Sequence, residues 1–305
     1  MILSISCRIA ESFLSKEVAS LTFEEFADVA VAAGYDAVCM RASQIGIQSS
    51  PEQVQRARQI LDERKLKVTM ISGDFDIVYN NERGPNCLYN VGPYLDLAEA
   101  LGAKLIRVCI KKPEDLVQAR HAAEQAAARG LHLVHQCHVQ SLFETVPEII
   151  SCLQQIDHPN FGLIFEAANL EQCGQDYGPA TIAKLAPWIR NVYFQNQKMH
   201  ADGKVQLATW CQGPVNIDLI EIHEPGGIDF DSVFEGLKGI SYDGPITVHQ
   251  SGPEDGELTA AEAAKLTAEF LKQRAGQWPY HSLSKACSKP IERNPQADVQ
   301  RPDAV

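Results

Sequence analysis

The chain has 305 residues, of which 45% are hydrophobic and 22% charged, a composition that excludes wholesale disorder and a collagen-like or coiled-coil chain. Its 39 Asp and Glu residues outnumber 27 Lys and Arg residues, and the net charge of -12 disfavours nucleic acid as a partner. No apolar run reaches the roughly 18 residues that a membrane span needs, and the first residues lack the basic and apolar regions of a signal peptide. We therefore expect a cytoplasmic protein without a membrane partner.

Short apolar runs rich in β-branched residues alternate along the chain with amphipathic segments of helical period. This alternation is typical of repeated strand–helix units around a parallel sheet. Eight such units predict one α/β domain, a single parallel (β/α)8 TIM barrel over residues 1–274. The predicted strands cover residues 2–7, 37–40, 67–71, 105–110, 131–136, 162–165, 191–194 and 245–249.

The segments between these strands carry helix signals at both ends. Thr22 and Glu25 have the spacing of a capping box, which marks a helix start. Gly34, Gly102 and Gly130 stand where helices are expected to end, because glycine readily adopts the left-handed conformation of a helix terminus. These signals support the division of the chain into strand–helix units.

Two long connections, residues 73–90 and 195–227, follow the C-terminal ends of the third and seventh predicted strands. Long loops at this end of a barrel usually shape an active site. A last helix is predicted over residues 259–273. The polar segment 275–305 contains prolines and has no period, so we expect a disordered or loosely docked tail.

Polar side chains stand at the C-terminal ends of the predicted strands, where the functional groups of a barrel lie. Arg41 ends the second strand, and its guanidinium can bind a phosphate or carboxylate or can pair with an acid such as Asp74 or Asp76. The later strand ends carry carboxamides, imidazoles and a carboxylate, namely Gln136, His138, Glu166, Asn169, Gln195, Asn196 and His249. Such groups suit a divalent ion, proton transfer next to a carbonyl, or contacts with sugar hydroxyls.

Three stretches of the sequence resemble the xylose isomerase-like barrels, a family that includes sugar and sugar phosphate isomerases, epimerases and inosose dehydratases. The resemblance spans residues 1–273 and is carried by the segments QCHVQSLFET (136–145), FGLIFEAAN (161–169), and PGGIDF (225–230) with YDGPITVH (242–249). It implies an enzyme that removes a proton next to the carbonyl of a sugar or polyol. A divalent metal (Mn, Zn, Fe, Co or Mg) would polarise the carbonyl oxygen.

The resemblance also implies metal ligands, although the chain departs from the usual Glu, Asp, His and Glu. Glu144 keeps the first carboxylate and Glu166 replaces the Asp. Tyr193 stands at the His position and His249 at the second Glu position. With two further histidines as candidate ligands, the expected metal set is Glu144, Glu166, His249, His138 and His223.

The implied catalytic pair is Glu144 and His249, with an imidazole in place of the second carboxylate. Glu144 has a competing interpretation, because Ser141 and Glu144 have capping-box spacing. The expected substrate contacts are Arg41, Gln136, Asn169, Tyr193, Gln195 and Asn196.

Three functions are open at this point. The first is an isomerase or epimerase acting on a sugar or sugar phosphate. The second is a lyase that dehydrates an inosose-like keto polyol after the same proton abstraction. The third is a non-catalytic sugar-binding relative with a degenerate metal site. A small sugar or polyol is the expected partner in each case, and assembly into a homo-oligomer is also open.

Overall fold

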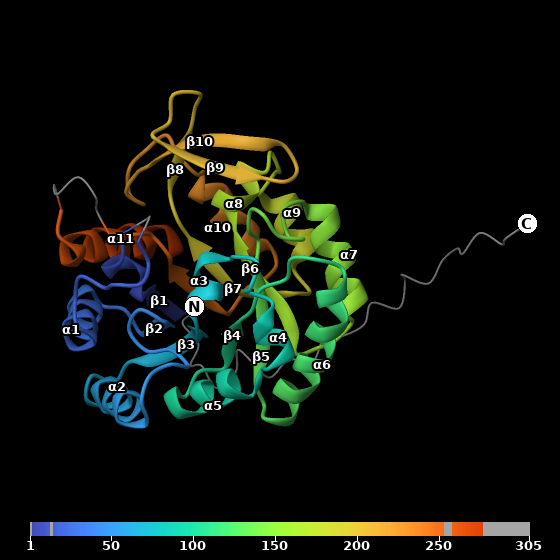
Figure 1. Ribbon diagram of the computed structural model, residues 1–305. Helices are drawn as coiled ribbons and strands as arrows, with labels where there is room; N and C mark the ends of the chain where they lie inside the picture. The colour runs from blue at the N-terminus through green and yellow to red at the C-terminus, as the bar shows by residue number, and fades with distance from the viewer. Residues whose placement is uncertain (1, 13–14, 253–257, 277–305) are drawn as a thin grey trace, which may run out of the picture.

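The structure, a computed structural model, describes residues 2–12, 15–252 and 258–276. Eight parallel strands form a closed barrel in the order β1-β11-β7-β6-β5-β4-β3-β2, which confirms the predicted architecture (Figure 1). Each predicted strand overlaps one barrel strand. The barrel strands are β1 (Ile2–Ser6), β2 (Ala37–Arg41), β3 (Lys67–Ser72), β4 (Leu105–Arg107), β5 (His132–Gln136), β6 (Phe161–Glu166), β7 (Ile189–Phe194) and β11 (Pro245–Val248).

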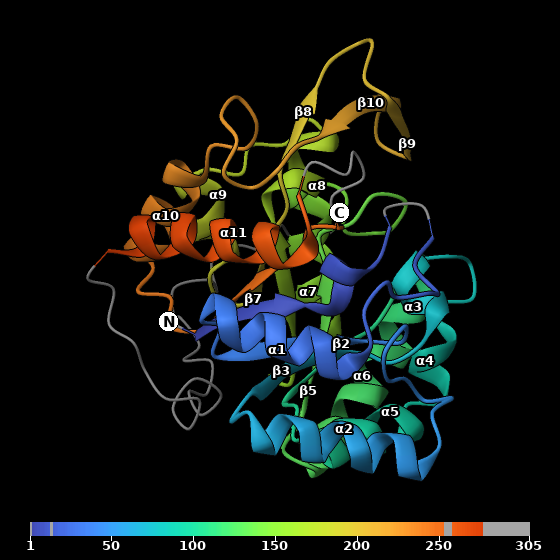
Figure 2. The same cartoon turned by 90° about the vertical axis from the view of Figure 1, so that its left-hand side faces the viewer.

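Helices surround the barrel (Figures 1 and 2). The longer ones are α1 (Phe23–Ala33), α2 (Pro51–Glu63), α5 (Gly92–Leu101), α6 (Glu114–Ala128), α7 (Val146–Ile156), α9 (Pro179–Leu185), α10 (Phe230–Gly239) and α11 (Ala260–Ala275). Short helical turns are η1 (Cys7–Ala10), α3 (Phe75–Tyr79), α4 (Asn86–Tyr89) and α8 (Ala167–Gln172). No helix in the described ranges is both long and apolar enough to cross a membrane.

The predicted helix ends match the structure closely. Thr22 and Glu25 form the capping box of α1. Gly34 and Gly102 end α1 and α5 in the left-handed conformation, with φ of 77° and 72°. The last helix runs two residues beyond its predicted end, to Ala275, so the predicted tail begins inside α11. The rest of that tail, from residue 277, lies outside the described residues.

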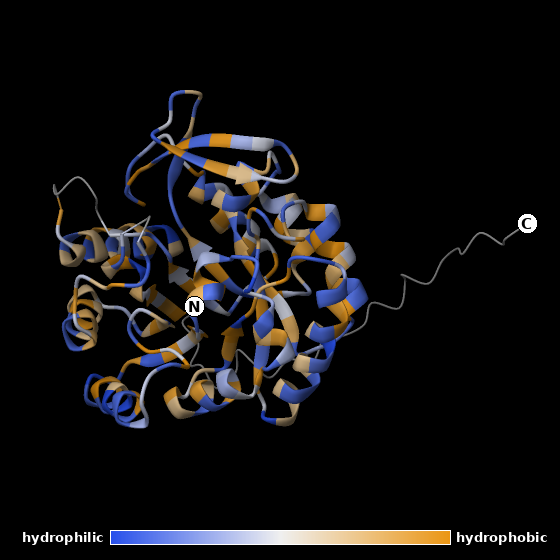
Figure 3. Cartoon of the chain, in the orientation of Figure 1, coloured by the Kyte–Doolittle hydropathy of each residue, from blue (hydrophilic) through white to orange (hydrophobic). Residues whose placement is uncertain are grey.

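Two separate hydrophobic clusters hold the barrel together. The larger lies between the strands and the helices. In Figure 3 the barrel strands are mostly hydrophobic (orange), whereas the helices carry both hydrophobic and hydrophilic (blue) residues. The smaller, which we call the inner cluster, takes one residue from each of β2 to β7, namely Cys39, Met70, Leu105, Val134, Ile164 and Tyr193. Such layers of inward-pointing side chains fill the interior of a (β/α)8 barrel.

The second long connection contains an element that the sequence patterns do not predict. It forms a three-stranded antiparallel sheet from β8 (Gln197–Met199), β9 (Val205–Thr209) and β10 (Gly213–Leu219). In Figures 1 and 2 this sheet stands near α8, outside the ring of helices. Most of its side chains are exposed or half-buried, so it lacks the apolar runs that mark the barrel strands.

The buried His135 makes the stability of the fold depend on pH. Burial lowers its pKa to about 3, and its Nδ1 lies 2.9 Å from the Val108 carbonyl oxygen. Because the folded pKa lies below the unfolded value of about 6.5, the stabilisation is present above pH 6.5 and is lost as the pH falls toward 3. We expect His135→Phe to reduce the loss of unfolding free energy between pH 7.5 and 5.0 by about 2 kcal/mol.

Chemical denaturation at both pH values measures this difference. His121→Phe, which changes an exposed histidine, serves as the matched control and should keep the wild-type pH dependence. An equal loss of stability in His135→Phe and the wild type would contradict a neutral His135 in the folded state.

Candidate functional site

A further layer of side chains lies above the inner cluster, at the C-terminal ends of the strands. Because every second side chain of a strand points to the same side, the residues two positions after the inner cluster also point to the barrel axis. They are joined by Arg8, after β1, and His249, after β11. We call this buried set the mouth layer; it consists of Arg8, Arg41, Ser72, Arg107, Gln136, Glu166, Gln195 and His249.

Three arginines make the mouth layer electropositive. Arg41 is fixed by Glu11, which accepts hydrogen bonds from its Nε at 2.9 and 3.0 Å, and Arg8 lies 3.8 Å from the same carboxylate. Burial raises the pKa of Glu11, but Arg41 and the Ser43 hydroxyl lower it by more, so this pKa falls below its usual range. Burial and the charges of Arg8 and Arg41 lower the pKa of the nearby Lys16 to about 6.

Several polar atoms of the mouth layer have no hydrogen-bond partner within the described part of the chain. They come from five adjacent strands, β2 to β6, and are Arg41 Nη1, Ser72 Oγ, Arg107 Nε, Gln136 Oε1 and Glu166 Oε1. Buried polar groups in folded proteins are nearly always hydrogen-bonded. Five unpartnered atoms in one layer make this layer the candidate site for a polar ligand.

Glu166 has the properties of an acid–base group. Its Oε2 accepts hydrogen bonds from Asn169 Nδ2 at 2.6 Å and from Gln136 Nε2. Burial raises its pKa to about 7, although these hydrogen bonds and the Arg107 charge act in the opposite direction. A carboxyl group with a pKa near 7 can both take up and release a proton at neutral pH.

His249 is held as a neutral imidazole beside Tyr193. The two rings stack with centroids 3.9 Å apart, and His249 Nδ1 lies 3.3 Å from Ser6 Oγ. Burial and the three arginine charges lower the pKa of His249 well below its usual value. Tyr193 itself belongs to the inner cluster, one layer below the mouth.

Glu144, the expected catalytic and metal-binding carboxylate, makes a structural contact. Within the described ranges it accepts hydrogen bonds from the backbone amides of Gln140, Trp210 and Cys211, at 2.5 to 2.9 Å. It thereby anchors the turn between β9 and β10 to the loop after β5. One potential ligand atom each from Glu144, Cys173 and Cys211 lies within 4.8 Å of the others.

The other predicted residues divide between the mouth and the loops. His138 lies close enough to Arg107 that burial and this charge lower its pKa well below its usual value. His223 lines a cavity of about 410 Å³, whose walls also include residues of the three-stranded sheet and the residues just after His249. Asn196 donates hydrogen bonds to the Glu221 and Glu224 carbonyl oxygens and so braces the loop before α10. The expected metal ligands are thus not brought into one group.

A divalent ion does not fit the four positions that the resemblance assigns to its ligands. The Glu144 carboxylate accepts backbone amides, and Tyr193 lies in the inner cluster under the His249 ring. Glu166 and His249 remain, but they share a layer with three guanidinium groups, whose charge repels a cation.

Sequence analysis did not single out Arg8, Glu11, Lys16 or Arg107. A signal was present for Arg107, which is a charged residue two positions after Leu105 within a predicted apolar strand. Such a side chain must point into the barrel whenever Leu105 does. Glu11 and Lys16 follow the first strand without any pattern that identifies them.

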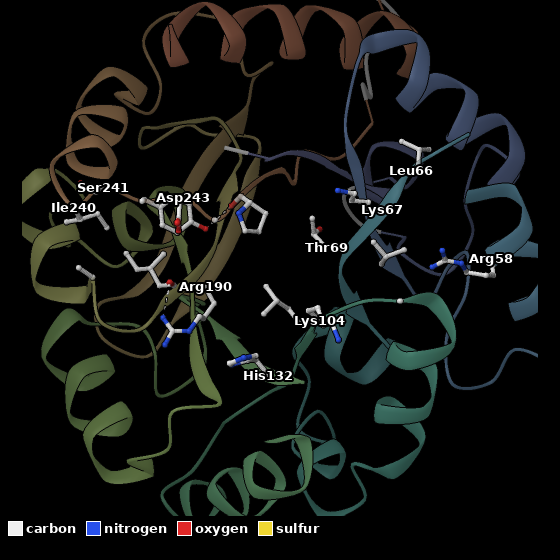
Figure 4. Close-up of a pocket in the computed structure, with 18 residues that line it drawn as sticks. Arg58, Leu66, Lys67, Thr69, Lys104, His132, Arg190, Ile240, Ser241 and Asp243 are labelled. Atoms are coloured by element: carbon white, nitrogen blue, oxygen red, sulfur yellow. Dashed lines mark hydrogen bonds between the residues drawn. The ribbon is translucent and has the colours of Figure 1, made fainter. Parts of the chain in front are cut away.

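A cavity of about 500 Å³ lies at the opposite end of the barrel (Figure 4). Its walls include Lys67, Lys104, His132 and Arg190, all near the N-terminal ends of barrel strands. Active sites of (β/α)8 enzymes lie at the other end, so this cavity is separate from the mouth layer.

Comparison with known proteins identifies the family of this chain. Residues 27–274 match the sequence profile of the xylose isomerase-like TIM barrel family. A curated relative is an inosose dehydratase from Geobacillus thermodenitrificans (strain NG80-2), which is 26% identical over 153 residues, 50% of each chain. The chain therefore spans about half the length of the curated relatives it matches.

Solved structures share the fold at low sequence identity. A D-allulose 3-epimerase from Methylomonas sp. in complex with D-allulose has a TM-score of 0.63 and 18% identity, covering 90% of this chain and 97% of that chain. A xylose isomerase-like TIM barrel protein from Mycobacterium smegmatis in complex with magnesium has a TM-score of 0.63 and 15% identity, covering 90% and 95%. At this identity the similarity establishes the barrel only.

The contacts of Glu144 predict the effect of Glu144→Gln. An uncharged amide loses the charge-assisted hydrogen bonds to Trp210 and Cys211, each worth about 1.5–3 kcal/mol. We expect hydrogen exchange of these two amides to become at least tenfold faster while the barrel stays folded. Exchange measured by mass spectrometry tests this, with Glu235→Gln on the exposed face of α10 as control. Unchanged exchange in Glu144→Gln would show that the carboxylate does not anchor the turn.

Proposed function

The chain belongs to the xylose isomerase-like TIM barrel family, and on that basis we propose that it is an enzyme that removes a proton next to the carbonyl of a sugar or related polyol. Two groups in the mouth layer support this proposal, an acid–base carboxyl group and a neutral imidazole. Glu166, with a pKa of about 7, and the neutral His249 share the layer in which five polar atoms lack partners. The family's known members include sugar-modifying dehydratases and epimerases.

Glu166 is the proposed base that takes the proton from carbon. Negative charge then develops on the carbonyl oxygen, and donors aimed at that oxygen lower the barrier. His249, held as a neutral imidazole, can donate its N–H to this oxygen.

The order of the strands favours isomerisation over epimerisation. Glu166 ends β6 and His249 follows β11, and only β7 separates these two strands in the barrel. Both groups therefore approach a substrate from neighbouring sectors. Epimerisation requires that a proton leaves one face of the carbon and returns to the other, whereas isomerisation moves a proton between adjacent carbons on one face.

Dehydration is the second candidate, and the curated inosose dehydratase supports it. The same first step removes the proton next to the carbonyl. A hydroxyl group on the adjacent carbon then leaves as water, and protonated Glu166 can supply the proton. Isomerisation and dehydration thus use the same side chains and differ in the fate of the intermediate.

We assign no step to a divalent ion, because the four family positions do not form a ligand set in this chain. The chemistry expected from such an ion is stabilisation of the developing oxyanion. In the mouth layer the N–H of the neutral His249, with the positive charge of the buried arginines behind it, can perform this task.

The test of this function is proton exchange. A panel of polyhydroxylated ketones is incubated with the protein in deuterium oxide, and NMR follows the replacement of protons next to the carbonyl. We expect Glu166→Gln to lower the exchange rate at least 100-fold and His249→Asn to lower it at least tenfold. The same incubation in ordinary water separates the two reactions, because loss of water, seen by mass, identifies dehydration, whereas a new sugar of unchanged mass identifies isomerisation.

Glu235→Gln, with its side chain on an exposed helix face, is the control and should exchange at the wild-type rate. Full exchange in Glu166→Gln would remove Glu166 from the mechanism. Absence of exchange with every ketone, together with sugar binding, would support the non-catalytic alternative.

A further inference from the structure

Arg107 is the most unusual residue of the mouth layer. Its side chain is only 2% exposed, and in the described part of the chain its guanidinium makes no hydrogen bond and no ion pair. Burying a charge without a partner destabilises a fold. A buried arginine in this state is expected where a charged ligand completes the site.

In the described part of the chain, two carboxylates buried at this end of the barrel, Glu11 and Glu166, are already engaged by other groups. Glu11 binds the Arg41 guanidinium through both oxygens, and Glu166 accepts two carboxamide hydrogen bonds. Burial lowers the pKa of Arg107, and Arg41 adds a like charge that lowers it further. Positive charge therefore exceeds negative charge in the mouth layer, in a chain whose net charge is -12.

The unpartnered atoms indicate the geometry of the missing partner. Arg41 Nη1 on β2 and Arg107 Nε on β4 are donors that flank Ser72 Oγ on β3. Two guanidinium donors with a hydroxyl between them suit the oxygens of a carboxylate or phosphate group. A divalent cation would meet two guanidinium charges on this side of the barrel, and their repulsion disfavours it.

We infer that Arg107 and Arg41 form an anion subsite in the mouth layer, so that the substrate of this enzyme carries a carboxylate or phosphate group. That the bound anion belongs to a substrate rests on the proposed function, whereas the anion subsite itself does not. Glu166 and His249 lie on the other side of the layer, on β6 and after β11. An anion held at β2 to β4 would therefore leave the reacting carbon to them.

Calorimetric titration of the full chain tests the subsite without any need for turnover. The probes are inorganic phosphate, D-gluconate and sorbitol, a neutral polyol that differs from gluconate in lacking the carboxylate. We expect phosphate or gluconate to bind one-to-one at least tenfold more tightly than sorbitol, and the stronger of the two anions identifies the charged group. Arg107→Met should weaken anion binding at least tenfold.

Lys265→Met removes the same charge from an exposed position on α11 and should bind anions like the wild type. A second readout separates a binding role from a structural one. Without anion, Arg107→Met should unfold at a higher temperature than the wild type, by roughly 2–4 °C, because it removes an unpaired buried charge. Should Arg107→Met fail to fold, Arg107→Lys, which keeps the charge but not the planar fork, should still bind phosphate with reduced affinity.

The inference is overturned if neither anion binds, if Arg107→Met binds anions as tightly as the wild type, or if it unfolds at a lower temperature. Anion binding by a protein that exchanges no proton would leave the subsite standing and remove the proposed catalysis. Turnover of neutral polyols by a protein that binds no anion would support the proposed catalysis and remove the subsite.

Discussion

A closed parallel barrel points every second side chain of each strand at its axis, and this constraint decides which residues of the chain can meet. Six strands contribute one inner-cluster residue each, and the residues two positions later form most of the mouth layer. The interior can therefore hold apolar side chains at one level and charged ones at the next. The charged level lies at the C-terminal ends of the strands, where a ligand can complete it.

The excess of arginines in the mouth layer goes together with a change at the ligand positions that the resemblance implies. A His at the position of Tyr193 and a Glu at that of His249 would give a cation site, but here the stacked rings of Tyr193 and His249 occupy these positions. Glu144 keeps its carboxylate and uses it to hold the β9–β10 turn. Positive charge from guanidinium groups then replaces the charge of an ion, and the site favours anions.

The barrel was predictable from the sequence because its signals are local: apolar runs of strand length, helix periods and glycines such as Gly34 at helix ends. The site was only partly predictable, because its contacts join distant segments. Arg41 was identified, but its partner is Glu11, 30 residues away, and not Asp74 or Asp76. The contact of Glu144 with Trp210 spans 66 residues, and α7 is capped by Thr145. No spacing rule reveals such pairs.

Crystals grown separately with phosphate and with manganese test the charge of the mouth layer most directly, since anomalous scattering identifies a bound manganese ion. We predict a phosphate within hydrogen-bond distance, roughly 2.7–3.2 Å, of Arg107 Nε and Arg41 Nη1, with no manganese bound by Glu166 and His249. A manganese ion coordinated by Glu166 and His249, with no anion at the arginines, would contradict it.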